Sequence, residues 1–435
     1  MNTKDYLVYC WKHKMCNEIV TTEGMSVEVT DQGLFNRNDG RSFFNAKVRI
    51  DNTLYVGNVL VLVRSSDWYL NGFDLKEEFC NVILVICEAP DSELFNSKGE
   101  HVNVSKVTIP ENVLNNLGIL TDPKIGQLVC KGNIMKYNSI LIRHAWFAAM
   151  QTEFLEEKSD AIKHIQCENG DVYWDSTAFI SLFGSFGFGR NDDNMIKLAK
   201  SIPLRVIEHY KDDLFQIEAL ILGQAGLLEL NCISLQYQEK ALSEGYFAKL
   251  RNEYIYLAHK HSLKPIRVDW NKFGPGQQQF PHVVLSMLAN LYYSRDLSTK
   301  SILDIKSVDD CYHVFSTHPT PYWHLHYNFG AETKKSEKII SHDKKSYVIA
   351  SFFVPFIFAY GRAKSDEVLC DRAFDIMEQM KVFSTQETKL FTRAGIVPKD
   401  AGECIAQIQL QRNYCDEHDC INCRFGFNFV KNHKS

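Results

Sequence analysis

The hydrophobic pattern of this 435-residue chain changes its period near residue 140. Before that point, residues 43–50 alternate between apolar and polar side chains, whereas residues 81–87 are apolar on both faces. Alternation is typical of a half-buried strand, and a short run that is apolar on both sides is typical of a strand inside a covered sheet. The pattern therefore predicts a sheet-rich unit over residues 1–135. Weaker strands are predicted at residues 27–29, 102–109 and 125–130.

After residue 140, apolar side chains recur at spacings of three and four residues, which predicts a set of packed helices. Residues 270–281 are rich in Gly, Pro and Gln and are predicted to form an exposed connection between two helical regions. The expected fold class is α+β, with a mixed or antiparallel N-terminal sheet followed by helical regions over residues 136–270 and 271–435.

A lysine-rich stretch at residues 331–346 is expected to be a solvated loop, with a phosphate-binding patch as the alternative. The stretch contains Lys334, Lys335, Lys338, Lys344 and Lys345.

Composition excludes several classes of protein. Hydrophobic residues make up 45% and charged residues 23% of the chain, and the net charge of −5 provides no general basic field for phosphate backbones. Charged side chains interrupt the N-terminal residues, which argues against a secretory signal. Residues 347–360 are apolar, but they fall short of the roughly 18 residues of a spanning helix and contain Pro355. We therefore expect a cytoplasmic protein without a membrane segment, in which residues 347–360 form a buried core helix.

The two strands at residues 43–50 and 54–63 are predicted to form a hairpin with a three-residue loop. With Ile50 opposite Leu54, residue 44 would face residue 60 and residue 42 would face residue 62, all on one face. Acids at such positions can hold a divalent cation for phosphodiester hydrolysis. The chain instead has Ser42, Leu60 and Leu62 there, so this face is predicted to be a packing surface.

The C-terminal segment carries a possible metal site. Cys415, Cys420 and Cys423 lie within nine residues of one another in the sequence, with His418 between them. Thiolates at this spacing favour zinc or an iron-sulfur cluster, and reduced thiols without metal are the alternative. A capped helix starting near Asp400 is predicted to precede the segment. The fourth ligand would be His418, Cys404, Cys10 or Cys16.

Trp323 and His326 belong to the densest group of aromatic and imidazole side chains. Helical spacing would place both on one face, where they could stack on a base or take part in catalysis. A histidine beside large aromatic residues is more often hydrogen-bonded and partly buried, and we favour that interpretation.

Several segments resemble one bacterial family. They are residues 24–50, 57–74, 217–228, 322–329, 354–361 and 414–426. The family is known as domain of unknown function 2851, and the likeness extends over nearly the whole chain. The resemblance implies Pro-Asp at residues 41 and 42 of relatives, Glu and His at residues 60 and 62, and His at residues 71, 73 and 85. That layout is similar to a metal-dependent nuclease core, which is an analogy of fold and not of activity.

This chain departs from the family pattern at all of these positions. It carries Arg41, Ser42, Leu60, Leu62, Asn71, Phe73 and Val85. The Arg-rich segment of the family is also replaced, by residues 272–279. We therefore expect a catalytically degenerate member that acts in binding or as a scaffold, with nucleic acid or another protein as its partner.

Two alternatives remain at this stage. The first is an active metal-dependent nuclease in which Glu28, Asn58 and Asp67 are catalytic and Ser42, Asn45 and Trp68 bind substrate. We favour instead the interpretation that the polar residues of this set and Ser66 form turn hydrogen bonds while Trp68 fills a core. The second alternative is a metal or redox sensor that uses the C-terminal cysteines.

Overall fold

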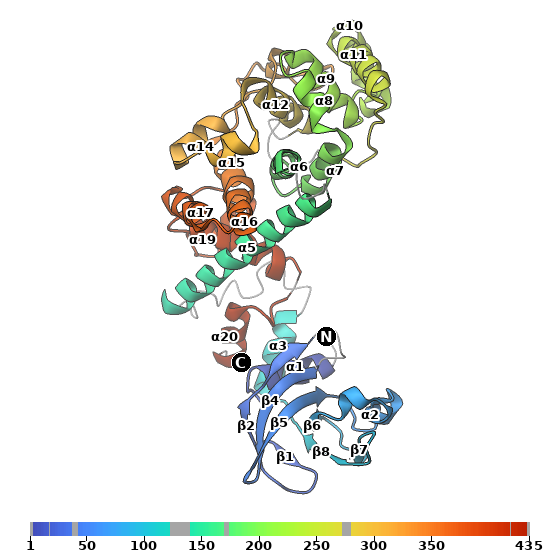
Figure 1. The fold of residues 1–435 in the computed structure, drawn as a ribbon, viewed down its shortest axis with the longest axis vertical. Helices are drawn as coiled ribbons and strands as arrows, with labels where there is room; N and C mark the ends of the chain where they lie inside the picture. Colours follow the sequence, from blue (N-terminus) through green and yellow to red (C-terminus); the bar gives the residue numbers. More distant parts are fainter. Residues whose placement is uncertain are drawn as a thin grey trace. The chain divides into compact units, whose positions relative to one another are not determined.

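The computed structural model describes residues 3–16, 18–36, 42–121, 140–168, 174–271, 280–417 and 419–432. The chain divides into two compact units (Figure 1). The first unit combines Met1–Arg143 with Gln411–Ser435 and contains a mixed sheet, and the second unit, His144–Leu410, is mainly helical. The predicted α+β fold class is confirmed.

The strands described in the first unit form one mixed sheet in the order β1-β8-β6-β5-β4-β2 (Figure 1). The β5–β6 and β6–β8 pairs are parallel, whereas the β2–β4, β4–β5 and β1–β8 pairs are antiparallel. Short strands β3 and β7 pair with β4 and β8. The strands are β1 (Val20–Thr21), β2 (Val27–Asp31), β3 (Leu34–Asn36), β4 (Ser42–Ile50), β5 (Thr53–Val61), β6 (Val82–Cys87), β7 (Leu94–Phe95) and β8 (His101–Lys106). The predicted strand at residues 125–130 lies outside the described residues.

The β4–β5 hairpin is confirmed, but its predicted turn is wrong. Ile50 lies opposite Thr53 and not opposite Leu54. The turn therefore has two residues, Asp51 and Asn52, and Asp51 adopts a positive φ of 48°. Two-residue turns with positive φ match the twist of antiparallel strands, which explains why the shorter turn is adopted.

A second shift of register occurs inside β4. The pairing slips between Phe43 and Ala46, where Asn45 adopts a φ of 53°. This β-bulge places Ser42 opposite Leu60, whereas the alternation of the sequence predicted residue 62. It also buries Phe43 rather than Phe44 with the inward residues of β4.

Alternate residues of β5 and β6 enter two separate hydrophobic clusters. Val59 and Val61 of β5 pack on one face of the sheet with Leu7 and Trp11 of helix α1 (Thr3–Lys12). The intervening Leu60 belongs to a cluster on the opposite face. Both faces of β6 and of the C-terminal part of β5 are therefore covered, and for residues 81–87 this confirms the prediction.

The connection from β5 to β6 covers the second face. It contains α2 (Asp67–Leu70) and two 3-10 helices, η1 (Phe73–Leu75) and η2 (Glu77–Phe79). A third cluster joins α1 to helices α3 (Glu111–Thr121) and α20 (Arg424–Asn432) through Cys10, Leu117 and Phe429. The C-terminal segment thus packs against the N-terminal helix inside the first unit.

One large hydrophobic cluster joins residues from Phe154 to Ile408 in the second unit. Its helices in the first half are α5 (Ile140–Glu168), α6 (Trp174–Ser185), α7 (Asp192–Ser201), α8 (Leu204–His209), α9 (Leu214–Gln224), η4 (Leu230–Cys232), α10 (Leu235–Ser243) and α11 (Tyr246–His261). They are followed by α12 (Pro281–Ser294), α13 (Thr299–Leu303), α14 (Val308–Val314), η6 (Pro321–His324), α15 (His342–Val348), the π-helix η7 (Ile349–Phe353), α16 (Val354–Lys364), α17 (Glu367–Gln379), α18 (Gln386–Arg393) and α19 (Ala401–Leu410). A two-stranded ladder joins β9 (His326–Asn328) to β10 (Ala331–Glu332).

The predicted exposed connection at residues 270–281 is wrong at both of its described ends. Trp270 packs against the large cluster and donates its indole N–H to the Ala225 carbonyl at 2.9 Å. Pro281 is buried at the first position of α12. Residues 272–279 lie outside the described residues.

Helix α9 lies at the centre of the second unit. Its residues from Ile217 to Gln224 are all buried, so the helix is covered on every side. At Gly223 a Cβ atom would lie 2.0 Å from the Tyr254 ring of α11. The close packing of α9 on α11 therefore requires glycine at this position.

The apolar run at residues 347–360 is part of a longer helix. Elements α15, η7 and α16 form a continuous helix, His342–Lys364, of 23 residues. By length and composition it is the one helix among the described residues that could cross a membrane, and 72% of its most apolar window is buried inside the protein. The π-helix ends at Phe353, two residues before Pro355, whose missing N–H interrupts the regular ladder. The predicted buried core helix is confirmed, although it is longer than predicted.

The second face of the sheet provides the first test. We expect Trp68→Ala to lower the free energy of unfolding by about 3 to 5 kcal/mol, because the indole is fully buried and its removal leaves a cavity. The matched control is Leu70→Ala on the same short helix, since Leu70 is 83% exposed. Denaturant titration of both variants measures the difference, and equal losses would contradict this account of the core.

Candidate functional site

The positions at which the family resemblance implies Glu and His form an apolar surface here. Leu60 and Leu62 are 0% and 2% exposed, and Val85 on the neighbouring strand β6 is 0% exposed. The backbone of Ser42 lies opposite Leu60, so residues 42 and 60 converge as predicted, although through a different register. The predicted packing surface is confirmed for Leu60 and Leu62.

Three aromatic side chains cover this surface. Trp68, Phe73 and Phe79 are in mutual contact, with ring centroids 5.8 Å (Trp68–Phe73), 6.1 Å (Trp68–Phe79) and 4.3 Å (Phe73–Phe79) apart. The Trp68 indole N–H donates to the Phe95 carbonyl at 3.0 Å, which satisfies its polar atom inside the core. Trp68 therefore fills a core, as the sequence interpretation favoured.

The candidate catalytic acids Glu28 and Asp67 lie far apart in the sheet. Glu28 on β2 lies opposite Arg49, and Arg49 lies opposite Leu54 near the start of β5. Asp67 follows the other end of β5. The strand from Leu54 to Val61 spans roughly 23 Å at about 3.3 Å per residue. The two carboxylates therefore do not share one cation, and the exposed Glu28 pairs with Arg49 at 3.9 Å.

Asn45 and Asn58 come together at the bulge. The Asn45 backbone N–H donates to the Asn58 side-chain oxygen at 3.4 Å. Asn45 holds the positive φ that the bulge requires, and asparagine tolerates this conformation better than most residues. Asn45 through its backbone and Asn58 through its side chain thus stabilise the bend of the β4–β5 pair.

Ser66 and Asp67 lie at the carboxyl ends of the parallel strands β5 and β6. The Asp91 carboxylate, from the loop after β6, accepts bonds from the Ser66 backbone N–H at 2.8 Å and from the Ser66 hydroxyl at 2.9 Å. Asp67 accepts the Arg64 backbone N–H at 3.1 Å. The bonds from Ser66 hold the pKa of Asp91 below its usual value. The sequence analysis missed Asp91, because its partners are brought together only by parallel pairing.

The C-terminal cysteines were a second candidate site. Cys420 packs at the edge of the cluster that contains Cys10 and Cys16, so the fold brings the remote cysteines to the C-terminal segment. Burial raises the pKa of both Cys10 and Cys16 to about 12. Cys423 is also buried. Cys404 belongs to the second unit, where its thiol donates to the Phe383 carbonyl at 3.3 Å.

A metal at these cysteines stays a prediction. Within the described residues, no three His, Cys, Asp or Glu side chains are grouped closely enough to hold a metal ion. His418 lies outside the described residues. The helix expected before the segment is confirmed as α19, and its Glu403 backbone N–H is capped by the Asp400 side chain at 2.8 Å.

A polar centre that the sequence analysis missed surrounds Glu218 of α9. The carboxylate is fully buried. It accepts hydrogen bonds from the Trp323 indole at 2.8 Å, the Thr320 hydroxyl at 2.9 Å and the Tyr246 hydroxyl at 2.6 Å. A buried carboxylate is tolerated when several donors face it, and here the donors come from two separate segments, α11 and the stretch around η6. Glu218 thus fixes η6 and α11 to the central helix.

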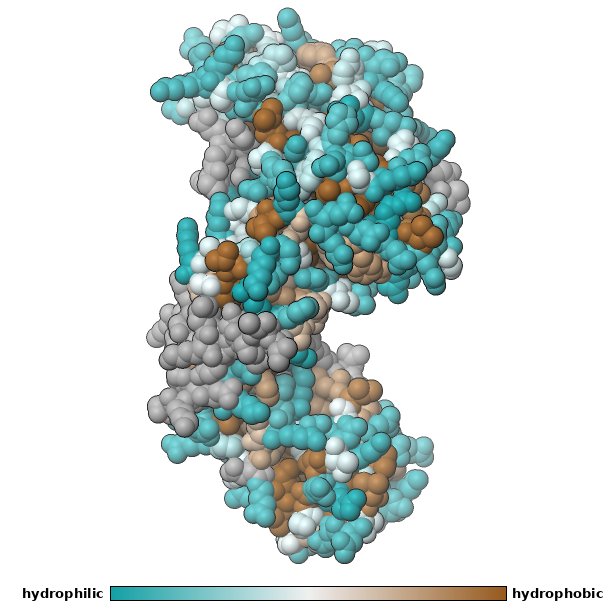
Figure 2. All heavy atoms as spheres, turned by 90° about the vertical axis from the view of Figure 1, so that its left-hand side faces the viewer, coloured by the Kyte–Doolittle hydropathy of each residue, from teal (hydrophilic) through white to brown (hydrophobic). Residues whose placement is uncertain are grey.

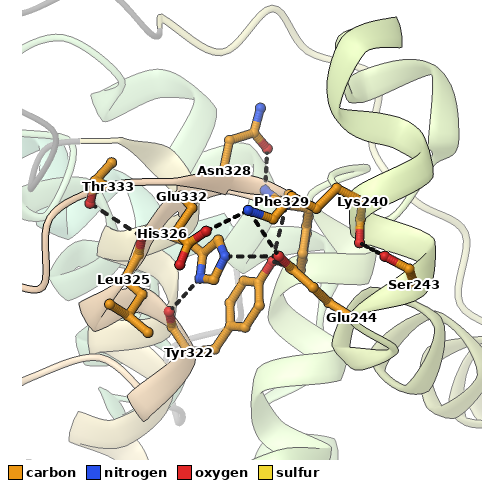
Figure 3. A network of polar contacts seen from close by, with 11 residues as sticks. Lys240, Ser243, Glu244, Tyr322, Leu325, His326, Asn328, Phe329, Glu332 and Thr333 are labelled. Carbon is orange, nitrogen blue, oxygen red and sulfur yellow. Dashed lines mark hydrogen bonds and ion pairs between the residues drawn. The ribbon is translucent and has the colours of Figure 1, made fainter.

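His326 belongs to a neighbouring network (Figure 3). Its Nε2 lies 3.2 Å from the Glu244 carboxylate and its Nδ1 lies 3.0 Å from the Tyr322 carbonyl. The Tyr322 ring stacks on the imidazole at 4.0 Å between centroids, and the Tyr322 hydroxyl donates to Glu244 at 2.7 Å. Lys240 pairs with Glu332 beside it. One face and both nitrogens of His326 are therefore occupied within the protein.

The predicted common helical face of Trp323 and His326 is wrong. The 3-10 helix η6 ends at His324, and His326 begins strand β9. Trp323 is fully buried and His326 is 6% exposed, so neither ring presents a surface on which a base could stack in this conformation.

The predicted solvated loop is confirmed for Lys334 and Lys335, which are exposed, but it is wrong for Lys338 and Lys344. Lys338 is fully buried, and its ammonium donates to the carbonyls of Trp323 and His326. Lys344 lies 4.5 Å from the centre of the Phe188 ring, and burial lowers its pKa to about 8. These lysines stabilise the fold instead of forming a free basic patch.

The sequence of the chain is similar to a known protein family. One family, described as a protein of unknown function (DUF2851), matches residues 4–385. The chain belongs to the DUF2851 family. The match in this DUF2851 protein runs from α1 to the residue before α18, so it includes the sheet and the Glu218 centre but not the C-terminal cysteines. Neither the curated proteins nor the solved structures gave a match to the chain.

The Glu218 centre gives a second test. We expect Glu218→Leu to cost more than about 3 kcal/mol of stability, because three donors lose their buried acceptor. Glu218→Gln is the matched control, since it retains one oxygen and nearly the same volume. Thermal and denaturant unfolding measure both variants. A Leu variant as stable as the Gln variant would show that the hydrogen bonds do not matter.

The metal prediction has a direct test. If the C-terminal cysteines hold zinc or an iron-sulfur cluster, protein purified without oxygen contains about one metal site per chain, and Cys420→Ser lowers that content. Cys232→Ser in the second unit is the control. Elemental analysis and the visible absorption spectrum are the measurements, and protein free of both zinc and iron would end the metal hypothesis.

Proposed function

We propose that this protein is a catalytically degenerate DUF2851 member that acts by binding another protein or as a scaffold. The observation that carries the proposal is the burial of Leu60 and Leu62 beneath Trp68. The family pattern has Glu and His at these two positions, where they could ligate a divalent cation. Leucine offers no ligand, and the aromatic side chains leave the surface covered.

The polar residues retained from the family pattern support the same conclusion. Asn45 and Asn58 stabilise the bulge, while Ser66 and Asp67 make the hydrogen bonds of the loops after β5 and β6. Each therefore has a role in the fold that does not depend on a cation. Glu28 is too distant from Asp67 to complete a second acidic site.

A binding role is supported by the tip of the β4–β5 hairpin. Leu54, Tyr55 and Val56 follow one another in β5 and are 52%, 37% and 58% exposed. Successive residues of a strand point to opposite faces, so apolar side chains reach solvent on both sides of the tip. Hydrophobic side chains also reach the surface of the sheet unit on the face drawn in Figure 2. Exposed apolar groups of this kind favour a protein partner over nucleic acid.

The proposal is tested by a nuclease assay with magnesium and with manganese on single- and double-stranded DNA and RNA. We expect no turnover above that of a buffer control. If turnover appears, Asp67→Ala and the control Glu77→Ala are compared, since Glu77 is an exposed acid on the same connection. Turnover that Asp67→Ala abolishes and Glu77→Ala retains would refute the proposal and restore the metal-dependent nuclease.

A further inference from the structure

A small cavity in the second unit contains an arginine without a partner. The cavity has a volume of about 70 Å³ and lies among the start of α6, helix α8 and the end of α12. Arg295 lines it, and its Nε is buried from solvent without a hydrogen-bond partner. Its side chain makes no hydrogen bond or ion pair with any residue that the structure describes. Arg295 as a whole is partly exposed, but its buried Nε lacks an acceptor, and an oxyanion can supply one in a bidentate manner.

Two of the acids that line the cavity, Asp296 and Asp175, accept hydrogen bonds within the protein. Asp296 accepts the Ser301 hydroxyl at 2.7 Å and the Ser298 backbone N–H at 3.0 Å, and Lys211 lies close enough to help lower its pKa. Asp175 accepts the Thr299 backbone N–H at 2.6 Å. Hydrogen bonds within the protein therefore already occupy both carboxylates.

Glu208 differs from the other two acids. It lines the same cavity from α8, and its carboxylate has no hydrogen bond or ion pair to the described part of the chain. Glu208 and Arg295 do not pair with each other either. Arg295 and the exposed Glu208 thus line the cavity without a hydrogen bond or ion pair to the described residues, and Lys211 adds a second cation to the wall.

The remaining wall is apolar and aromatic. Phe179 is 2% exposed, and its ring lies 5.3 Å from that of Tyr292 in an edge-to-face arrangement. Burial raises the pKa of Tyr292 well above its usual value, so its hydroxyl stays neutral. An aromatic wall beside a carboxylate suits an ammonium group, which is attracted to both.

We propose that this cavity binds a small zwitterion of the α-amino-acid type. Its carboxylate meets the Arg295 guanidinium, its ammonium group meets Glu208, and its side chain lies against Phe179 and Tyr292. The small volume selects compact amino acids over nucleotides. This site lies in the helical unit, so it is independent of the binding role proposed for the sheet.

The test measures ligand binding to the full chain by calorimetry and by the rise in Tm. The probes are a panel of free α-amino acids, together with acetate, inorganic phosphate and an alkylamine as half-ligands. We expect at least one compact amino acid to bind in the millimolar range or tighter, and each half-ligand to bind more weakly. We expect Arg295→Gln to weaken amino-acid binding by about tenfold or more, as for other charge-assisted contacts.

The variants separate the two charges. Glu208→Gln weakens amino-acid binding and leaves acetate binding unchanged. Exposed groups elsewhere in the same unit supply the matched controls Arg251→Gln and Glu239→Gln, which bind like the wild type. Since the Arg295 side chain has no hydrogen bond or ion pair to the described residues, Arg295→Gln keeps the wild-type Tm without ligand, and Arg295→Lys gives an intermediate affinity.

Three outcomes would overturn the proposal. The first is the absence of amino-acid binding at millimolar concentration. The second is binding that survives Arg295→Gln unchanged. The third is binding of acetate or phosphate as tight as that of any amino acid and insensitive to Glu208→Gln, which would make the cavity a simple anion site.

Discussion

Burial of the β5–β6 strand pair on both faces is the constraint on which the first unit depends. Alternate side chains of these strands pack under α1 on one face and under Trp68 and its aromatic neighbours on the other. A parallel pair covered on both sides has no solvated face on which a polar residue could be placed without a partner. The identity of residues 60 and 62 therefore decides at once whether the second face can hold a cation or must be covered by hydrophobic side chains.

The periodicity of the sequence was sufficient to predict the elements but not their register. The apolar run of residues 81–87 correctly predicted a covered strand. The bulge at Asn45 could not be predicted, because one extra residue changes the pairing without changing the composition of the strand. The two-residue turn at Asp51 could not be predicted either, since a turn of two residues and a turn of three fit the same hydrophobic alternation. Helix α1 went unpredicted because it is buried between the sheet and α3, which removes the polar stripe that identifies an amphipathic helix.

Polar contacts between distant segments were the least predictable part of the site. Glu218 lies in an apolar helix and receives its donors from residues about 30 to 100 positions away, so local spacing does not predict its role. Lys338 was expected in a solvated loop because charge runs are usually exposed. The structure instead directs its ammonium to two backbone carbonyls of the segment that Glu218 also holds. Glu218 thus holds this short segment by accepting hydrogen bonds from its side chains. Lys338 holds the same segment by donating to its backbone carbonyls.

The proposed loss of a metal site is compatible with preservation of the fold for a physical reason. Ligating carboxylates that lack their cation would repel one another and leave buried charge unpaired, so the loss of metal binding favours their replacement by apolar side chains. Leu60, Leu62, Phe73 and Val85 form such a replacement, and together they extend the hydrophobic core under Trp68. Reversing a single position would bury one charge without its cation and its fellow ligands. Catalysis could therefore return only through several simultaneous changes, whereas any binding surface at the exposed hairpin tip remains free to change one residue at a time.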